Sequence, residues 1–461
     1  MSQSVHGTWA NRWLFILAAT GSAVGLGNIW KFPYITGENG GGAFVLMYLL
    51  CIALVGIPVM IAEVMLGRMG RQSPINTMVG LVKRFHAPVF WAGIGWMGAL
   101  AGFLILSFYS VIAGWALAYI PKLAMGDFQQ ATGEYAAATF GNLLASPQTL
   151  TLWHSLFMLA TIFVVARGVN RGLEAAIKWL MPLLFVLLFV LLAYAVQTDS
   201  FSAGVDFLFS FDFSKLSRES LVIALGHSFF TLSLGLGAIM AYGAYMPQSA
   251  SISKTIVVVA VLDTLVALAS GMVIFPIVFS NGLEPGAGPG LLFQTLPIAF
   301  GNMAAGSFFG VLFFVLVVFA ALTSSISLAE PIVAWLVESK GWSRLRAGAC
   351  VGLSAWLLGL GTVLSFNHWA DYTLFGKTFF DCLDFLTTNI MLPLGGLLIA
   401  VFVAWVLSKQ TVADELRMGP PALYNAWRFI LMFISPLAVL AVLLNGLPFL
   451  STLIGQIKSL L

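Results

Sequence analysis

Eleven long apolar segments follow one another along the chain, and the polar residues gather between them. A helix needs about 20 apolar residues to cross the hydrocarbon core of a bilayer. The pattern therefore predicts an all-α polytopic membrane protein with eleven transmembrane helices. We expect the spans at 12–38, 42–67, 89–120, 150–166, 174–197, 219–246, 255–280, 306–337, 346–365, 379–407 and 427–457.

Glycine pairs interrupt the first and the sixth of these spans. Gly25 and Gly27 lie within the first, and Gly235 and Gly237 lie within the sixth. Each glycine weakens a helix by about 1 kcal/mol relative to alanine, and a lipid-facing helix cannot leave backbone groups unpaired. We expect both spans to be unwound at mid-membrane, where the freed groups face a cavity or a ligand. Interrupted helices in corresponding positions of two halves indicate the binding site of a secondary transporter.

The two interrupted spans also indicate an internal repeat within a single transmembrane domain over 1–461. The first unit covers spans 1–5 (9–198), and the second covers spans 6–10 (218–408). Because five is an odd number of crossings, the second unit is expected to be inverted in the membrane relative to the first. One additional helix is predicted in 425–461.

Composition and charge agree with a membrane protein. Charged residues make up 8% of the chain, whereas a soluble domain has about 25%. Most of the 21 Lys and Arg residues fall on the side of the predicted spans that carries the N-terminus. Cytoplasmic loops are enriched in Lys and Arg, so we expect a multi-pass protein of the cell membrane, the inner membrane of a bacterium, with a cytoplasmic N-terminus and an external C-terminus. The net charge of +3 reflects this asymmetry; it indicates no nucleic-acid partner, and no obligatory protein partner is evident.

Two other functional classes lack their sequence signals. A channel would show a continuous polar stripe or carbonyl-ring motifs, and a hydrolase would show a motif such as Gly-x-Ser-x-Gly or His-Glu-x-x-His. The sequence has neither, so we do not expect an enzyme. Cys51, Cys350 and Cys382 fall in or beside spans without metal-ligand spacing, and we expect buried apolar cysteines.

Several blocks of the chain resemble the neurotransmitter:sodium symporter family. They lie in spans 1, 2, 6 and 8, at 21–34, 38–44, 56–58, Glu63 with 67–68, 228–235 and 320–325. The resemblance covers spans 1–10. It implies the LeuT fold, a 5+5 inverted repeat plus one further helix, and a sodium-coupled symporter that imports an amino acid by alternating access.

The resemblance implies two sodium sites built from oxygen ligands, which hard cations prefer. The first would use the Ala23 carbonyl with Asn28, Thr231, Asp263 and the substrate carboxylate. The second would use the carbonyls of Gly21, Val24 and Ala320 with the hydroxyls of Thr323 and Ser324. The alternative for the two hydroxyls is hydrogen bonding back to their own helix, which is common in membrane helices.

Asp263 departs from the family pattern. It is the one carboxylate in the apolar stretch 257–266. A charged side chain at the bilayer centre is energetically costly, so it usually indicates a functional residue. Related sequences often have Asn here and Glu one turn later, and in animal members chloride near that later position supplies negative charge. Ala267 stands there in this chain. We therefore expect chloride not to be required, because Asp263 supplies the charge; the alternative is a protonated Asp263 that bonds a neighbouring helix.

Gly25 bears on the substrate class. Amine-transporting members have an Asp at the matching position, whereas Gly leaves room for an α-carboxylate held by amides of the first break and by Tyr109. The carbonyls of Phe230 and Thr231 would take the ammonium group. The implied pocket comprises Ser22, Ala23, Gly25, Gly27, Ile105, Tyr109, Phe230, Thr231, Ser233, Leu236, Ala321, Ser325 and Leu328. Its mostly apolar side chains favour neutral hydrophobic L-amino acids, aliphatic or aromatic. The alternative is another small zwitterion, either a small amino acid or an amino-sulfonate.

Gates are implied on both sides of this pocket. Lys31 and Asp384 resemble the outer ion pair, although the family usually has Arg at the first position, and Phe230 with Tyr109 would form an aromatic lid. The matching inner residues are Trp9, Tyr245 and Glu338, with His6 in place of the usual N-terminal Arg.

Three further residues are predicted to support the fold or its motion. We expect Glu63 to accept hydrogen bonds from amides freed by the break in the sixth span. Gly172 and Pro182 resemble a pair that lets the inner end of span five unwind, although Pro also breaks helices without such a role.

The outer connection 281–305 is either a helical hairpin dipping into an outer vestibule or a flexible loop.

Overall fold

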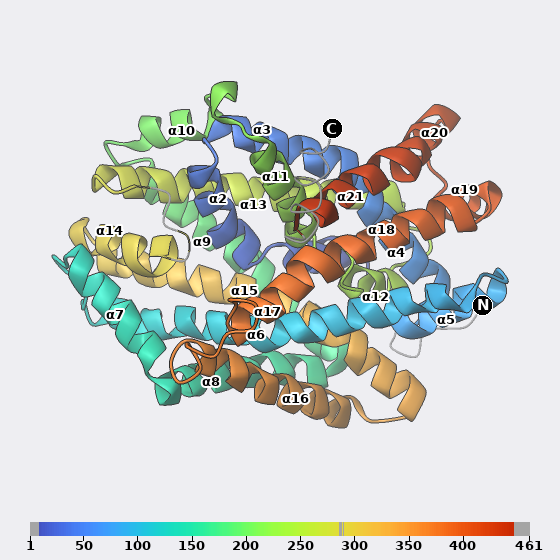
Figure 1. Ribbon diagram of the computed structural model, residues 1–461, viewed down its shortest axis with the longest axis horizontal. Helices are drawn as coiled ribbons and strands as arrows, with labels where there is room; N and C mark the ends of the chain where they lie inside the picture. The colour runs from blue at the N-terminus through green and yellow to red at the C-terminus, as the bar shows by residue number, and fades with distance from the viewer. Residues whose placement is uncertain (1–8, 285–287, 289, 447–461) are drawn as a thin grey trace, which may run out of the picture.

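The computed structural model describes residues 9–284, 288 and 290–446, and nearly all of this part of the chain is helical (Figure 1). Nine of its helices are long and apolar enough to cross a membrane. A tenth span consists of α1 (Arg12–Ala23) and the helical stretch Gly27–Glu38, which meet at a bend of 53°. The predicted sixth span is divided into α11 (Arg218–Thr231) and α12 (Ala238–Ala244), each too short to span alone. Helices therefore lie at all eleven predicted positions.

The first span continues after its break through a π-helical turn into α2 (Phe32–Glu38). The remaining spans are single helices or pairs of helices joined by such turns. They are α3 (Gly42–Cys51) with α4 (Ile57–Gly70), α6 (Gly93–Ala124), α8 (Pro147–Ala166), α9 (Ala175–Ala195), α13 (Ile252–Ser280), α15 (Gly306–Lys340), α16 (Arg344–Ser365), α17 (Phe379–Asp384) with α18 (Leu392–Val401), and α20 (Pro421–Phe429) with α21 (Ser435–Gly446).

Short connecting helices mark the two ends of the bundle (Figure 1). At the end drawn on the left lie α7 (Gly133–Ala145), α10 (Phe201–Phe209) and α14 (Leu296–Asn302), and at the right-hand end lie α5 (Pro74–Arg84) and α19 (Lys409–Leu416). The long helix α6 runs between these ends. The left-hand helices belong to the connections expected outside the cell, so we call this end the external end and the opposite one the cytoplasmic end.

The connection 281–305 is mainly helical where it is described. Residues Leu291–Asn302 form a π-helical turn and then α14. Phe293 is fully buried, and its ring packs against those of Trp115, Tyr119 and Phe140. This burial of apolar surface stabilises the helical alternative over a flexible loop.

Local backbone chemistry explains the break in the sixth span. Ser233, Gly235 and Gly237 all have positive φ, at 53°, 76° and 70°. Glycine adopts this region without steric cost, whereas other residues do so rarely. A Cβ atom on Gly235 would also lie 2.6 Å from the Leu392 carbonyl oxygen. Glycine is therefore required at this position by both conformation and close packing.

Some sequence-based expectations differ from the structure. Cys51 is buried as predicted, but Cys350 is exposed on α16, and Cys382 is partly exposed where its sulfur meets the connection before α17. In this conformation span five is helical around Gly172, as a π-helical turn over Val169–Glu174 that leads into α9, which contains Pro182. The unwinding expected of Gly172 and Pro182 therefore stays a prediction. Residue His6 and the predicted end of the last span, 447–457, lie outside the described residues.

Candidate functional site

The two broken spans meet at the centre of the bundle. The Ser233 hydroxyl donates a hydrogen bond to the Ser22 carbonyl oxygen at 2.8 Å, which joins one break directly to the other. The amide of Gly235 donates to Glu63 Oε2 at 2.9 Å, and Glu63 is fully buried. A carboxylate is a strong acceptor for an amide released from a helix. This contact is the one expected for Glu63.

Three of the four residues predicted for the first sodium site lie together, and all three are buried. Asn28 Nδ2 donates to Asp263 Oδ1 at 2.8 Å and to the Asp263 carbonyl oxygen at 3.1 Å. The Thr231 hydroxyl donates to Asp263 Oδ2 at 3.1 Å. Asn28 Oδ1 accepts from the Gly25 amide at 3.2 Å, so this cluster also holds the break after Ala23 in place.

The residues predicted for the second sodium site surround the same break from α15. Ser324 Oγ lies 3.4, 3.3 and 3.1 Å from the carbonyl oxygens of Gly21, Ser22 and Val24. A hydroxyl has one hydrogen to donate, so it serves only one of these three acceptors at a time. The Ser22 oxygen also accepts from Ser233, so two hydroxyl hydrogens serve three buried carbonyl oxygens. An excess of oxygen acceptors over hydrogens is an environment suited to a cation.

Thr323 lies beside this oxygen group. A Cβ on Gly21 would be 3.3 Å from Thr323 Cβ. In this conformation Thr323 Oγ1 donates to the carbonyl oxygens of Phe319 and Ala320, at 3.2 and 3.0 Å. The Thr323 hydroxyl therefore hydrogen-bonds its own helix, which is the alternative to sodium binding given above. The Ser324 hydroxyl instead contacts the first span.

A cavity of about 30 Å³ lies between the two breaks. Its walls are backbone and hydroxyl groups from the breaks on one side and apolar side chains on the other. The lining residues are Ser22, Ala23, Gly25, Leu26, Gly27, Ile105, Tyr109, Phe230, Ser233, Leu236, Ser324 and Leu328. The Leu26 amide donates to the Tyr109 hydroxyl at 3.3 Å, which places that hydroxyl at the first break.

Three residues predicted for the pocket do not line this cavity. Thr231 instead faces Asp263. Ser325 Oγ lies 2.8 Å from the Thr161 hydroxyl on α8, and it also donates to the Leu322 carbonyl oxygen. Ala321 is fully buried in α15 outside the lining. Because successive helix positions point in different directions, Ser324 faces the break while Ser325 faces α8.

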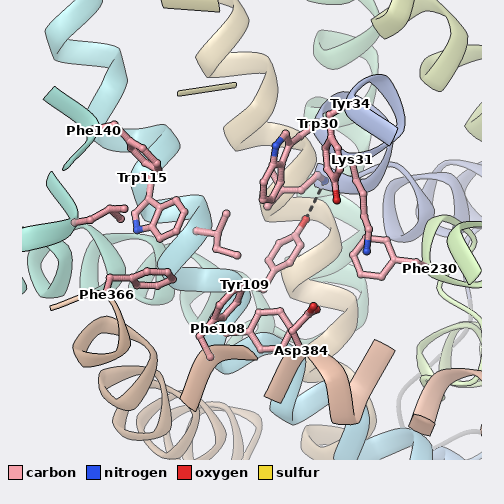
Figure 2. A pocket seen from close by; sticks show the side chains of 14 residues that line it. Trp30, Lys31, Tyr34, Phe108, Tyr109, Trp115, Phe140, Phe230, Phe366 and Asp384 are labelled. Carbon is pink, nitrogen blue, oxygen red and sulfur yellow. Dashed lines mark hydrogen bonds between the residues drawn. The ribbon is translucent and has the colours of Figure 1, made fainter. Parts of the chain in front are cut away.

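A larger vestibule of about 310 Å³ lies on the external side of the cavity (Figure 2). Leu26, Tyr109 and Phe230 line both spaces, so they separate the cavity from the vestibule. The vestibule wall is largely aromatic, with Trp30, Trp115 and Phe366 among its residues.

The predicted outer ion pair is not formed in this conformation. Lys31 and Asp384 both line the vestibule, but they are absent from the ion pairs of the described residues. Lys31 Nζ instead lies 4.6 Å from the centre of the Phe230 ring, within the range of a cation–π interaction. Figure 2 shows the end of the lysine side chain next to this ring. The lysine is thus held against the predicted lid residue and away from Asp384.

The cytoplasmic side of the cavity is closed by buried contacts. The Trp9 amide donates to the Tyr245 carbonyl oxygen at 3.0 Å, and Trp9 Nε1 donates to the Tyr242 carbonyl oxygen at 3.2 Å. Glu338 accepts from the Ser73 amide at 2.7 Å and from Asn76 Nδ2 at 2.8 Å, which ties the end of α15 to the start of α5. The vestibule lies on the opposite side of the cavity, at the end that we call external.

Comparison with known proteins shows the family of this chain. The model of the sodium:neurotransmitter symporter family matches residues 6–135 and 141–453. The chain belongs to this family. The uncharacterized sodium-dependent transporter YhdH of Bacillus subtilis (strain 168) is 39% identical over 454 residues, which cover 98% of this chain and 100% of YhdH. A sodium-dependent transporter of Haemophilus influenzae is 34% identical over 447 residues, with coverage of 95% and 98%.

The fold also matches a solved member of the family. The structure of MhsT in complex with L-phenylalanine aligns with a TM-score of 0.88 and 42% identity, covering 96% of this chain and 100% of MhsT. MhsT has the LeuT fold, so the predicted fold class is confirmed. The protein is accordingly a multi-pass, sodium-dependent membrane transporter of the symporter family, and the family is one of transporters rather than enzymes.

Two residues at the cytoplasmic end were not identified from the sequence. Glu330 is fully buried and accepts from Arg344 Nη1 at 2.9 Å, from Arg344 Nη2 at 2.5 Å and from the Tyr245 hydroxyl at 2.8 Å. The sequence does contain an indication of Glu330, because it is a carboxylate within an apolar span. A charged residue in a membrane span indicates function, and the same argument identified Asp263. Its partner begins the next helix, at a sequence distance that gives no indication of pairing.

Proposed function

We propose that this protein is a symporter that uses two sodium ions to import neutral hydrophobic L-amino acids by alternating access. The external vestibule receives the substrate and the ions, and the cavity between the two breaks binds them. The cytoplasmic contacts of Trp9 and Tyr245 then open to release them. This direction rests on the expected topology, with the N-terminus cytoplasmic and the C-terminus external.

The group of oxygens around Ser324 carries the proposal. Three carbonyl oxygens from the first break lie within 3.4 Å of a hydroxyl that has a single hydrogen. A sodium ion at this position supplies the positive charge that the excess acceptors need. It also links α15 to the first span, so that sodium binding stabilises one arrangement of the two elements.

A second ion is proposed at Asn28, Thr231 and Asp263. The carboxylate of Asp263 lies next to the proposed ion and balances part of the charge of the two cations. We therefore propose that transport does not require chloride. The Ala23 carbonyl and the substrate carboxylate complete the oxygen set in this proposal.

The substrate class follows from the space around Gly25. A Cβ atom here would lie 2.6 Å from Ser324 Oγ and 2.9 Å from the Tyr109 hydroxyl. An acidic side chain that would pair with an amine therefore does not fit. An α-carboxylate approaching the broken helix does fit the chemistry, since amides and the Tyr109 hydroxyl are donors. The complex of MhsT with L-phenylalanine supports the same class.

The small volume of the cavity supports a second candidate for the substrate class. A volume of about 30 Å³ is only about two to three times the 10–15 Å³ that a single water needs. This favours small zwitterions, such as glycine, alanine or an amino-sulfonate, unless Phe230 and Leu236 move outward when a larger side chain enters.

Uptake into proteoliposomes tests both candidates. An inward sodium gradient should drive accumulation of L-phenylalanine, L-leucine and L-tryptophan, and a potassium gradient of the same size should not. Tryptamine should not compete with L-tryptophan, because it lacks the carboxylate. Preferential uptake of glycine or taurine would establish the second candidate, and equal competition by tryptamine would contradict the proposed role of the carboxylate.

A further inference from the structure

A groove on the surface of the bundle lies apart from the transport site. Helices α8 and α16 run side by side along the lower edge of Figure 1, and between them is a depression of about 400 Å³. We call it the α8–α16 groove. Its sides are mainly Leu159, Ile162, Leu353 and Trp356, and Ala349 and Gly352 lie between them.

Small residues on α16 create the groove. A Cβ atom on Gly352 would lie 2.3 Å from Ile162 Cγ1, so glycine lets the two helices approach closely there. The larger side chains on either side, Leu159 and Leu353, are 67% and 59% exposed and border the hollow. Both helices are membrane spans, so these exposed apolar side chains face lipid.

The polar atoms in the groove are already paired with each other. Trp356 Nε1 donates to the Ser155 hydroxyl at 2.9 Å. The depression therefore offers a hydrocarbon-like surface, and an acyl chain suits it better than a polar ligand does.

Two arginines stand at the cytoplasmic end of the groove. Arg167 follows the last residue of α8, and Arg346 lies in the first turn of α16; both are exposed. Arg167 stacks on the Phe163 ring at 3.9 Å, and Arg346 stacks on the Trp342 ring at 4.3 Å. Each stack fixes its guanidinium against a nearby aromatic ring. Arg344, the first residue of α16, instead turns inward to Glu330.

The distance from the groove to the arginines is similar to the distance from the acyl chains to the phosphate of one phospholipid. Arg167 is five residues beyond Ile162 on the same chain, or roughly 7–8 Å along a helix axis. A phospholipid has a similar short distance between its phosphate and the upper part of its acyl chains. Basic pockets between transmembrane helices on the cytoplasmic side are typical sites for anionic headgroups.

We propose that the α8–α16 groove binds an anionic phospholipid, with an acyl chain between Leu159 and Leu353 and the phosphate between Arg167 and Arg346. The charge complementarity at the end of the groove favours this occupant over a second copy of the chain. A two-fold contact through this face would bring four guanidiniums together at the same level of the membrane, where they repel one another.

Native mass spectrometry of the delipidated full-length protein in detergent tests this site. The probes are phosphatidylglycerol and phosphatidylcholine with identical acyl chains, titrated separately. The wild type should bind one phosphatidylglycerol more tightly than any phosphatidylcholine. The double variant Arg167→Gln/Arg346→Gln should weaken that event by about 25-fold, since each arginine near a headgroup contributes roughly a factor of five. Its affinity for phosphatidylcholine should not change.

Matched variants separate the groove from general charge and apolar effects. Arg84→Gln removes an exposed arginine that also stacks on a ring, Phe85, away from the groove. It should leave lipid binding unchanged. Ala349→Phe fills the groove and should remove the tight lipid, whereas Ala160→Phe, at an exposed position of α8 outside the lining, should not.

Two lipid-binding results would overturn the proposal. One is equal affinity for the two lipids in the wild type. The other is loss of binding in Arg84→Gln as large as in the double arginine variant, since this would reduce the effect to overall charge. Dimers that form on delipidation and disappear in Ala349→Phe would assign the groove to a second copy instead. If Ala349→Phe does not fold, the arginine variants still decide the question.

Discussion

The hydroxyl of Tyr245 is expected to hold the cytoplasmic end closed. It donates to Glu330 at 2.8 Å, and the ring also packs edge-on against Trp9, with centroids 6.3 Å apart. Tyr245→Phe removes the hydroxyl and keeps the ring. Glu330 retains both hydrogen bonds from Arg344, so the substitution leaves no buried charge without a partner.

The size of the effect follows from the kind of bond removed. A hydrogen bond to a charged group contributes about 1.5–3 kcal/mol, which corresponds to a factor of roughly 10 to 100 in an equilibrium. The bond joins the end of α12 to α15. Its loss should therefore raise the population of molecules open at the cytoplasmic end by about that factor.

Hydrogen exchange measured by mass spectrometry reads this change directly. All seven residues of α12 are buried, so their amides should exchange slowly in the wild type. Tyr245→Phe should speed exchange over Ala238–Ala244 by about tenfold or more. Apparent substrate affinity from the external side should fall, since fewer molecules remain competent.

Tyr194→Phe is the matched control. Tyr194 donates to the Ala304 carbonyl oxygen at 3.1 Å, at the external end of the bundle. It should leave exchange in α12 unchanged. Wild-type exchange in Tyr245→Phe, or an equal increase in both variants, would refute the reasoning that this hydroxyl closes the cytoplasmic end.

Three further predictions concern the proposed ion and substrate sites. Ser324→Ala should weaken the sodium dependence of uptake by about tenfold or more, and a wild-type sodium titration in the Ser324→Ala/Thr323→Ala double variant would remove both residues from the second site. Gly25→Asp should abolish binding of radiolabelled L-phenylalanine, because its Cβ alone would lie 2.6 Å from Ser324 Oγ; Gly80→Ala, with open space around it, should bind normally. Wild-type uptake should persist when gluconate replaces all chloride, whereas Asp263→Asn should weaken sodium binding; a strict chloride requirement in the wild type would contradict the proposed charge balance.

The membrane spans and the two breaks were predictable from the sequence. Hydropathy is a local property, because the bilayer acts on each segment of about 20 residues separately. Glycine pairs are equally local, since they change the conformational preference of the residues that contain them. The resemblance then indicated which residues meet, and Asn28, Thr231 and Asp263 do lie together.

The contacts between helices were decided by the tertiary structure. Lys31 lies over Phe230 instead of pairing with Asp384, and Ser325 faces Thr161 instead of the cavity. A rotation or shift of one helix changes such distances by several ångströms without changing its apolar pattern. Which partner a side chain meets therefore depends on how the helices pack and on which side of the membrane the molecule is open.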